Sequence, residues 1–154
     1  MIAIGSDHGG YELKTKIVEH LEKKGFEIKD FGTNSSQSVD YPDYAQKVAM
    51  SIVSGKSQRG ILICGTGIGV SIAANKIPGI RSAVCTNVFM AKASRRHNNA
   101  NILAIGQRVL GDGLAFDIVD AFLDYDFDSG RHKKRVDKIY YIEKNFYRGD
   151  LKDE

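Results

Sequence analysis

Apolar residues recur along the chain in two alternating patterns. Short apolar runs occupy positions 1–5, 61–64, 82–85 and 102–105, and apolar and polar residues alternate over 26–31. Between these runs, apolar residues recur every three or four positions among polar ones, over 13–21, 42–55, 71–76, 88–96 and 114–123. The first pattern is typical of strands and the second of amphipathic helices, so strand and helix are predicted to alternate five times.

Apolar strands that alternate with helices predict a parallel sheet covered by helices on both faces. A last helical pattern begins at the basic residues 131–135, and we expect its apolar residues to dock on the body: Val136, Ile139, Tyr140 and Ile142. The predicted fold is α/β, a Rossmann-like three-layer α/β/α sandwich with a five-stranded parallel sheet and an added C-terminal helix. Residues 1–154 are predicted to form a single domain, because no linker, repeat or low-complexity tract divides them.

The composition is that of a soluble globular protein. The 154 residues are 42% hydrophobic and 27% charged, which excludes disorder for the bulk of the chain. The longest weakly polar stretch, 61–74, is interrupted by polar residues and glycines, and it is shorter than the ~20 residues of a membrane helix. Because the first residues also lack the regions of a signal peptide, we expect a cytoplasmic protein with no membrane partner.

The two cysteines, Cys64 and Cys85, are too few for a disulfide framework. No spacing of cysteines and histidines resembles a zinc site. We therefore predict no metal and no cofactor, and a reducing compartment.

The excess of positive charge lies at the end of the chain. The formal net charge is +3, and residues 1–130 carry 14 basic and 14 acidic side chains, whereas residues 131–154 carry 8 and 5. The run 131–135 contains four basic residues and His132. Such a run attracts phosphate, although a solvated helix face gives the same pattern. The broad basic footprint of a nucleic-acid binder is missing, so we expect a small phosphorylated ligand and no nucleic acid.

Chemically active side chains follow the predicted strands. Ligands of open parallel sheets bind beyond the carboxyl ends of the strands. The residues at these ends are Asp7 and His8 after the first strand, Cys64, Gly65, Thr66, Gly67, Ile68 and Gly69 at the third, Cys85, Thr86 and Asn87 at the fourth, and Gly106, Gln107 and Arg108 after the fifth. Carboxylate, imidazole, thiol and guanidinium are therefore expected to converge on one edge of the sheet.

The glycine loop 65–69 and the cysteine before it are the strongest candidates for chemistry. Such a loop directs backbone N–H groups at an anion above a helix N-terminus, and this setting favours a thiolate at Cys64. The loop is not the dinucleotide fingerprint, because Val70 replaces a required glycine, and it lacks the Gly-Lys-Ser/Thr ending of a P-loop. A tight turn beside a core cysteine is the alternative interpretation. Cys85, with no such loop, is interpreted as structural.

Three other runs also have two interpretations. Asp7 and His8 offer a carboxylate beside a titrating base, but Asp7 can equally cap the next helix. Basic residues at 95–97 suit a helix C-terminus even without a function. The run 41–44 resembles a helix start, and its tyrosines can also line a pocket.

Six runs of residues resemble, in order, the ribose-5-phosphate isomerase type B family. They are 6–14, 41–45, 64–69, 71–76, 96–101 and 130–136, and together they span nearly the whole chain. One such run would be a weak match, whereas six in order are highly specific. The resemblance implies an aldose–ketose isomerase that interconverts ribose 5-phosphate and ribulose 5-phosphate without a metal. It also implies a homodimer or homotetramer with the site at the subunit interface.

The resemblance assigns roles to individual residues. Cys64 corresponds to the base, His97 to the proton donor that opens the sugar ring, and Thr66 to a group facing the enediolate. Asp7 is placed with these catalytic residues. The substrate contacts implied are Asp7, His8, Gly65, Thr66, Gly67, Ile68, Gly69, Asn98, Arg108, Arg131 and Arg135, the last two on the phosphate. Some members of the family use a glutamate as the base, and this chain does not.

Other functions compete with this interpretation. A related galactose-6-phosphate isomerase divides its catalytic residues between two kinds of subunit, whereas this chain holds them together. Allose 6-phosphate is an alternative substrate, because pocket length decides between pentose and hexose. A non-catalytic phosphate- or nucleotide-binding module would want the complete glycine fingerprint. The polar tail at 147–154 is expected to fray and receives no role.

Overall fold

A five-stranded parallel sheet forms the centre of the computed structural model, which describes residues 1–148. The strands are β1 (Ile2–Ser6), β2 (Ile28–Asp30), β3 (Arg59–Cys64), β4 (Ser82–Val84) and β5 (Ile102–Gly106), in the order β2-β1-β3-β5-β4. The predicted parallel sheet is confirmed. Of the polar tail at 147–154, residues 149–154 lie outside the described residues.

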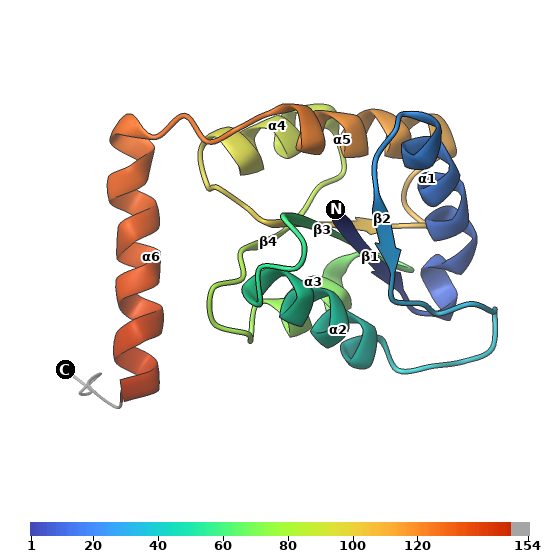
Figure 1. Cartoon of the computed structure of the whole chain (residues 1–154), viewed down its shortest axis with the longest axis horizontal. Helices are drawn as coiled ribbons and strands as arrows, with labels where there is room; N and C mark the ends of the chain where they lie inside the picture. The colour runs from blue at the N-terminus through green and yellow to red at the C-terminus, as the bar shows by residue number, and fades with distance from the viewer. Residues whose placement is uncertain (149–154) are drawn as a thin grey trace.

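Helices cover both faces of the sheet (Figure 1). One face carries α1 (Tyr11–Lys23), α4 (Val88–Arg96) and α5 (Asp112–Asp124), and the other carries α2 (Tyr41–Val53) and α3 (Ile68–Ala74). A single 3-10 turn, η1 (His8–Gly10), joins β1 to α1. This arrangement confirms the predicted three-layer sandwich. Among the described helices, none is long and apolar enough to cross a membrane.

Strand β3 shows how the sheet supplies two cores. Ile61 and Ile63 point into the cluster under α1 and α5, while Leu62 and Cys64 point into the cluster under α2 and α3. Successive side chains of a strand alternate between faces, so a strand buried on both faces must be apolar throughout. Cys64 is therefore the last buried residue of the strand, at its carboxyl end.

Strand β2 is shorter than the alternation at 26–31 predicts. It lies at the edge of the sheet and pairs only with β1. Outside the strand, Ile2 N–H still donates to the Glu27 carbonyl over 2.8 Å, and Phe31 N–H to the Ile4 carbonyl over 2.9 Å. The alternation thus covers the whole segment that runs alongside β1, and only the middle of this segment is a regular strand.

Helix α6 (Gly130–Arg148) stands apart from the sandwich (Figure 1). The expectation that its apolar residues dock on the body is wrong within one chain, because Ile139, Tyr140 and Ile142 are 47%, 60% and 59% exposed. Val136 is half-buried. Gly79 N–H donates to the Glu143 carboxylate over 2.9 Å, and Ile139 and Ile142 line an open pocket with Ile80 of the body. Helical periodicity predicts a face to be buried, but not the chain that buries it.

Gly10 brings the turn after β1 against β3. A Cβ built on Gly10 would lie 2.5 Å from the carbonyl oxygen of Ile63. No side chain fits at such a distance, so this approach requires glycine. It places Asp7 and His8 directly beside the end of β3, which carries Cys64.

We predict that Gly10→Ala lowers the free energy of unfolding by about 1–3 kcal/mol, because the added methyl group overpacks against backbone that cannot move aside. Urea unfolding followed by circular dichroism measures the change. The matched control is Gly113→Ala in the first turn of α5, where an added Cβ meets nothing within 4 Å. That variant should be unchanged or stabilised by about 0.4–1 kcal/mol. Equal stabilities of the two variants would contradict the close approach at Gly10.

Candidate active site

Cys64 lies beneath the glycine loop with its sulfur facing a backbone donor. The side chain is buried, and Gly67 N–H donates to Sγ over 3.1 Å. Gly67 has a left-handed backbone with φ 81°, and a Cβ there would lie 2.9 Å from the backbone of Ile105. The sulfur thus lies at the carboxyl end of β3, against the backbone of the glycine loop.

The end of β5 holds this loop in place. Gln107 N–H donates to the Cys64 carbonyl over 2.9 Å, and Arg108 N–H donates to the Gly65 carbonyl over 3.0 Å. A Cβ on Gly106 would lie 2.6 Å from the backbone of Thr66. Within the loop, Ile68 N–H donates to the Thr66 hydroxyl over 3.3 Å. Backbone contacts with the end of β5 therefore fix the path of the loop.

Asp7 presents an unsatisfied carboxylate oxygen beside the loop. Its side chain is buried, and Oδ1 has no hydrogen-bond partner among the described residues. A Cβ on Gly9 would lie 3.3 Å from this oxygen and 3.2 Å from the Gly65 nitrogen, so the two loops touch. The side chain makes no capping bond to η1, which removes the helix-cap interpretation. A buried acceptor left open at a sheet edge is suited to a ligand hydroxyl.

His8 is oriented by the segment that follows β2. Val39 N–H donates to Nδ1 of His8 over 3.2 Å. Nδ1 is therefore the acceptor, and the neutral ring carries its proton on Nε2. In this tautomer the Nε2 nitrogen of His8 is a hydrogen-bond donor and not an acceptor.

Two further side chains border the loop. The Arg108 guanidinium lies against Gly65, where an added Cβ would be 3.3 Å from Nη1, and the Tyr41 ring lies against Gly69 at 3.0 Å. The expected convergence of carboxylate, imidazole, thiol and guanidinium at one edge is thus what the structure shows. Asn87 differs, because its side chain accepts from Met90 N–H over 2.9 Å and caps α4.

A second cluster forms where α4 meets α6. His97 follows the last residue of α4, and its ring stacks on the ring of His132, with centroids 4.3 Å apart and planes 10° from parallel. Arg131 and Arg135 flank His132 on the exposed first turns of α6. Asn98 is also exposed. The basic run and the histidine that the resemblance singled out therefore belong to one cluster.

This second cluster is electropositive. Lost hydration lowers the pKa of His132, and the charges of His97, Arg131 and Arg135 lower it further, while Asp128 opposes them. The hydrogen bond from Arg96 lowers the pKa of Asp128, so this carboxylate is already engaged. An anion placed here would relieve the repulsion among the cations.

The same cluster contains the one group of side chains, within residues 1–148, that could hold a metal ion. The ligand atoms of His97, Asp128 and His132 all lie within 4.8 Å of one another. The two rings are nearly parallel, so their lone pairs do not converge on one point. Arg96 already binds the Asp128 carboxylate, and the nearby arginines oppose a cation. The donor set fits phosphate better than a metal.

Within one chain the two clusters lie at opposite edges of the sheet. Helix α4 starts beyond the carboxyl end of β4 and runs back over nine residues, about 13 Å. The turn after it leads to Asn101, whose carbonyl accepts from Gly60 N–H at the start of β3 over 2.9 Å. Cys64 lies at the other end of that strand, about 13 Å further along it. The structure thus assembles Cys64 with Asp7, His8, Thr66 and Arg108, but not with His97.

Cys85 is buried and lies at the end of β4. Burial raises the pKa of its thiol to about 11, while a hydrogen bond with Ser94 acts in the opposite direction. A neutral buried thiol agrees with the structural interpretation of this residue.

Sequence reasoning did not find the partnership of His97 with His132 and Asp128. His132 lies inside a basic run that the sequence pattern explains as a whole, so nothing singles out this histidine. Asp128 precedes the helix that this run begins. No spacing in the sequence connects positions 97 and 132, because the fold alone brings α4 and α6 together.

Comparison with known proteins places the chain in a family. A family model described as Ribose/Galactose Isomerase matches residues 2–139. Ribose-5-phosphate isomerase B of Escherichia coli is 52% identical over 142 residues, which cover 92% of this chain and 95% of that protein. A D-erythrulose-4-phosphate isomerase of Pectobacterium atrosepticum is 44% identical over 143 residues, 92% of this chain and 94% of that protein.

Solved structures give the same result. The Clostridium thermocellum ribose-5-phosphate isomerase B superposes with a TM-score of 0.93 at 61% identity, covering 94% of this chain and 98% of that one. The residues matched by the family model, 2–139, include the glycine loop, both clusters and the first half of α6. The chain therefore belongs to the ribose/galactose isomerase family and is a sugar-phosphate isomerase.

Proposed function

We propose that this enzyme interconverts ribose 5-phosphate and ribulose 5-phosphate through an enediolate, with Cys64 as the base. The observation that carries the proposal is the hydrogen bond from Gly67 N–H to Cys64 Sγ, at the edge where Asp7 holds an open carboxylate oxygen. The E. coli relative, a ribose-5-phosphate isomerase B, supports this choice of substrate. A reducing cytoplasm, the proposed location, would keep the thiol available.

The proposed reaction moves protons between neighbouring carbons of the open-chain sugar. The Cys64 thiolate takes the proton from C2, the electron pair of that C–H bond forms the C1–C2 double bond, and O1 becomes negatively charged. The proton then returns to C1, while the O2 proton passes to O1, and the ketose results. In this proposal, Thr66 and the loop N–H groups donate hydrogen bonds to the charged oxygens of the enediolate. Fixed donors at such oxygens accelerate a reaction. Asp7 can accept a hydrogen bond from a sugar hydroxyl.

A second copy of the chain is proposed to complete the site. His97, the proposed ring-opening donor, lies with Asn98, Arg131 and Arg135 near the start of β3, whereas Cys64 lies at the end of that strand. A homodimer, alone or within a tetramer, lets this cluster approach the partner's glycine loop. Exposed apolar side chains support such an interface, since Ile68, Ile72 and Phe89 are 55%, 57% and 76% exposed in addition to the apolar residues of α6.

The proposed base is tested by replacing Cys64. Cys64→Ser should fold normally but lose about 10²- to 10⁴-fold in kcat on ribose 5-phosphate, because a hydroxyl is a much weaker base than a thiolate. Cys85→Ser, the control with a buried neutral thiol, should keep most of its activity. Turnover is measured in an isomerase assay on ribose 5-phosphate, and in parallel on allose 6-phosphate and galactose 6-phosphate. Faster turnover of either hexose phosphate would identify a hexose isomerase. Near-normal turnover by Cys64→Ser would rule out the proposed base.

Another prediction concerns the shared site. Cys64→Ser and His97→Asn should each be nearly inactive, but co-expression should produce mixed dimers with one intact site. Random pairing then restores roughly a quarter of the wild-type activity. Two tags and tandem purification isolate the mixed dimer for assay. If the mixed dimer is as inactive as its parents, the site does not combine residues of two chains.

A further prediction concerns the phosphate. Arg131 and Arg135 lie four residues apart, so both project from one face of α6, and a charge-assisted bond to phosphate contributes about 1.5–3 kcal/mol. Arg131→Ala and Arg135→Ala should each lower kcat/KM by about 10- to 100-fold, mainly through KM.

The controls for this prediction are two neighbouring lysines. Lys133 pairs with Asp137 over 2.6 Å on the solvent side, and Lys134 is exposed. Lys133→Ala and Lys134→Ala should change kcat/KM little at low or high salt. Equal and modest losses in all four variants would show a general positive surface instead of a specific phosphate site.

A further inference from the structure

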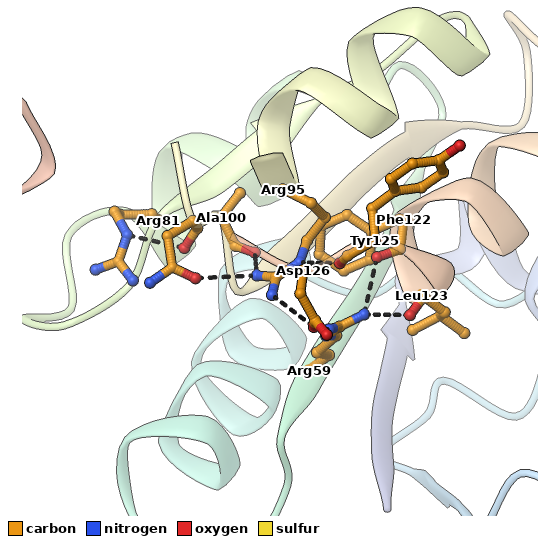
Figure 2. A network of polar contacts seen from close by, with 9 residues as sticks. Arg59, Arg81, Arg95, Ala100, Phe122, Leu123, Tyr125 and Asp126 are labelled. Carbon is orange, nitrogen blue, oxygen red and sulfur yellow. Dashed lines mark hydrogen bonds and ion pairs between the residues drawn. The ribbon is translucent and has the colours of Figure 1, made fainter. Parts of the chain in front are cut away.

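Three arginines bind backbone segments that adjoin the second cluster in the sequence (Figure 2). Arg59 from the start of β3, Arg81 from the segment before β4 and Arg95 from the end of α4 converge on two pieces of backbone. One piece is the turn at 99–100, which follows His97, and the other is the end of α5 with the residues after it, 122–126. The second piece leads directly to α6.

Arg95 is the arginine that contacts both pieces. Its Nε donates to the Tyr125 carbonyl over 3.1 Å, and its Nη1 donates to the Asn99 side chain over 3.3 Å and to the Ala100 carbonyl. The guanidinium also lies 5.7 Å from the centroid of the Phe122 ring. One rigid, planar group thus connects the turn after α4 with the segment before α6, and the side chain is only 7% exposed.

The charge of Arg95 is retained despite this burial. Loss of hydration and the neighbouring Arg59 lower the pKa of Arg95 to about 10, and Asp126 opposes them. The guanidinium therefore remains protonated at neutral pH and keeps all of its donors. Tyr125, Asn99 and Ala100 depend on those donors, since a buried acceptor that loses its partner is costly.

The two pieces that Arg95 connects carry the two halves of the second cluster. His97 lies two residues after Arg95 and two before Asn99, whose backbone is left-handed with φ 48°. Asp128, beyond Tyr125, donates its N–H to the Arg96 carbonyl over 3.0 Å. Helix α6 then brings His132 onto His97. Because the segment 125–128 leads directly into α6, its position helps to set where Arg131 and Arg135 lie.

We propose that Arg95 is a positioning residue for catalysis: it holds the His97 turn and the start of α6 in one fixed arrangement, so that the ring-opening histidine and the phosphate-binding arginines reach the substrate together. This inference rests on the proposed function. Displacements of about 1 Å at such groups can reduce turnover about 10²-fold without any direct contact to the substrate. A residue that merely stabilised the fold would lower stability and leave turnover by the folded protein unchanged.

The test compares Arg95→Lys with Arg59→Met. Lysine keeps the charge but cannot form the planar fork, so Arg95→Lys should lower kcat/KM on ribose 5-phosphate by about 10- to 100-fold, in kcat as well as KM. Arg59 donates to the carbonyls of Phe122 and Leu123 and pairs with Asp126, but does not touch the 99–100 turn. Arg59→Met therefore loosens only the segment before α6, and it should reduce stability while lowering kcat/KM clearly less than Arg95→Lys does.

A second readout does not depend on turnover. Nuclear magnetic resonance titration of the four histidines, assigned with His97→Asn and His132→Asn, reports the stacked pair. In Arg95→Lys the pair should separate, so that the pKa of His132 rises toward its ordinary value as hydration returns and the charge of His97 moves away. In Arg59→Met, which keeps the contacts of Arg95 with Asn99, Ala100 and Tyr125, the change should be smaller.

Each outcome decides one point. Unchanged histidine titrations in Arg95→Lys, with kcat/KM no lower than in Arg59→Met, would overturn the positioning role. A changed titration in a protein whose wild type isomerises no pentose phosphate would support the positioning role and refute the proposed function. If Arg95→Lys fails to fold, Asn99→Gly decides, since glycine keeps the left-handed backbone and removes only the side-chain contact with Arg95. It should show a smaller change of the same kind, and no change would overturn the inference.

Discussion

The loops after β1, β3 and β5 touch one another through backbone atoms, and the chemistry at the carboxyl edge depends on that contact. Gly10 meets the Ile63 carbonyl, Gly67 meets Ile105, and Gly106 meets Thr66, each at a distance that excludes a methyl group. Backbone packed this closely cannot shift independently, so the donors around Cys64 are arranged before a substrate arrives. Such preorganisation is what a developing oxyanion requires.

Much of this edge could be predicted from the sequence. Short, uninterrupted apolar runs bounded by glycines and polar residues are typical of buried parallel strands, and the ends of such strands must meet at one edge. Asp7, Cys64 and Arg108 therefore come together in the structure as the pattern predicts. The orientation of His8 could not be predicted, because it depends on a backbone N–H from position 39, in an irregular segment without a pattern.

The second cluster lay beyond sequence reasoning for a different reason. Periodicity shows that α6 has an apolar face, but it is silent on whether its own body or another chain covers that face. The stack of His97 on His132 arises from the path of the chain through 125–129, which contains no periodic signal. Arg95 looked like one more cation suited to a helix C-terminus, and only its burial among carbonyl groups separates it from Arg96.

Helix α6 stands apart from the sandwich of its own chain. In the proposed assembly, the Cys64 loop and the His97 cluster of one catalytic centre belong to two different chains, so the centre exists only when the chains associate. The activity per chain would then depend on protein concentration. Chains diluted below the dissociation constant of the assembly would be folded but inactive. A phosphorylated sugar that contacts both halves binds the associated form alone, so it draws chains together as it binds. The number of working centres in a cell would accordingly depend on the supply of substrate as well as on the abundance of the protein.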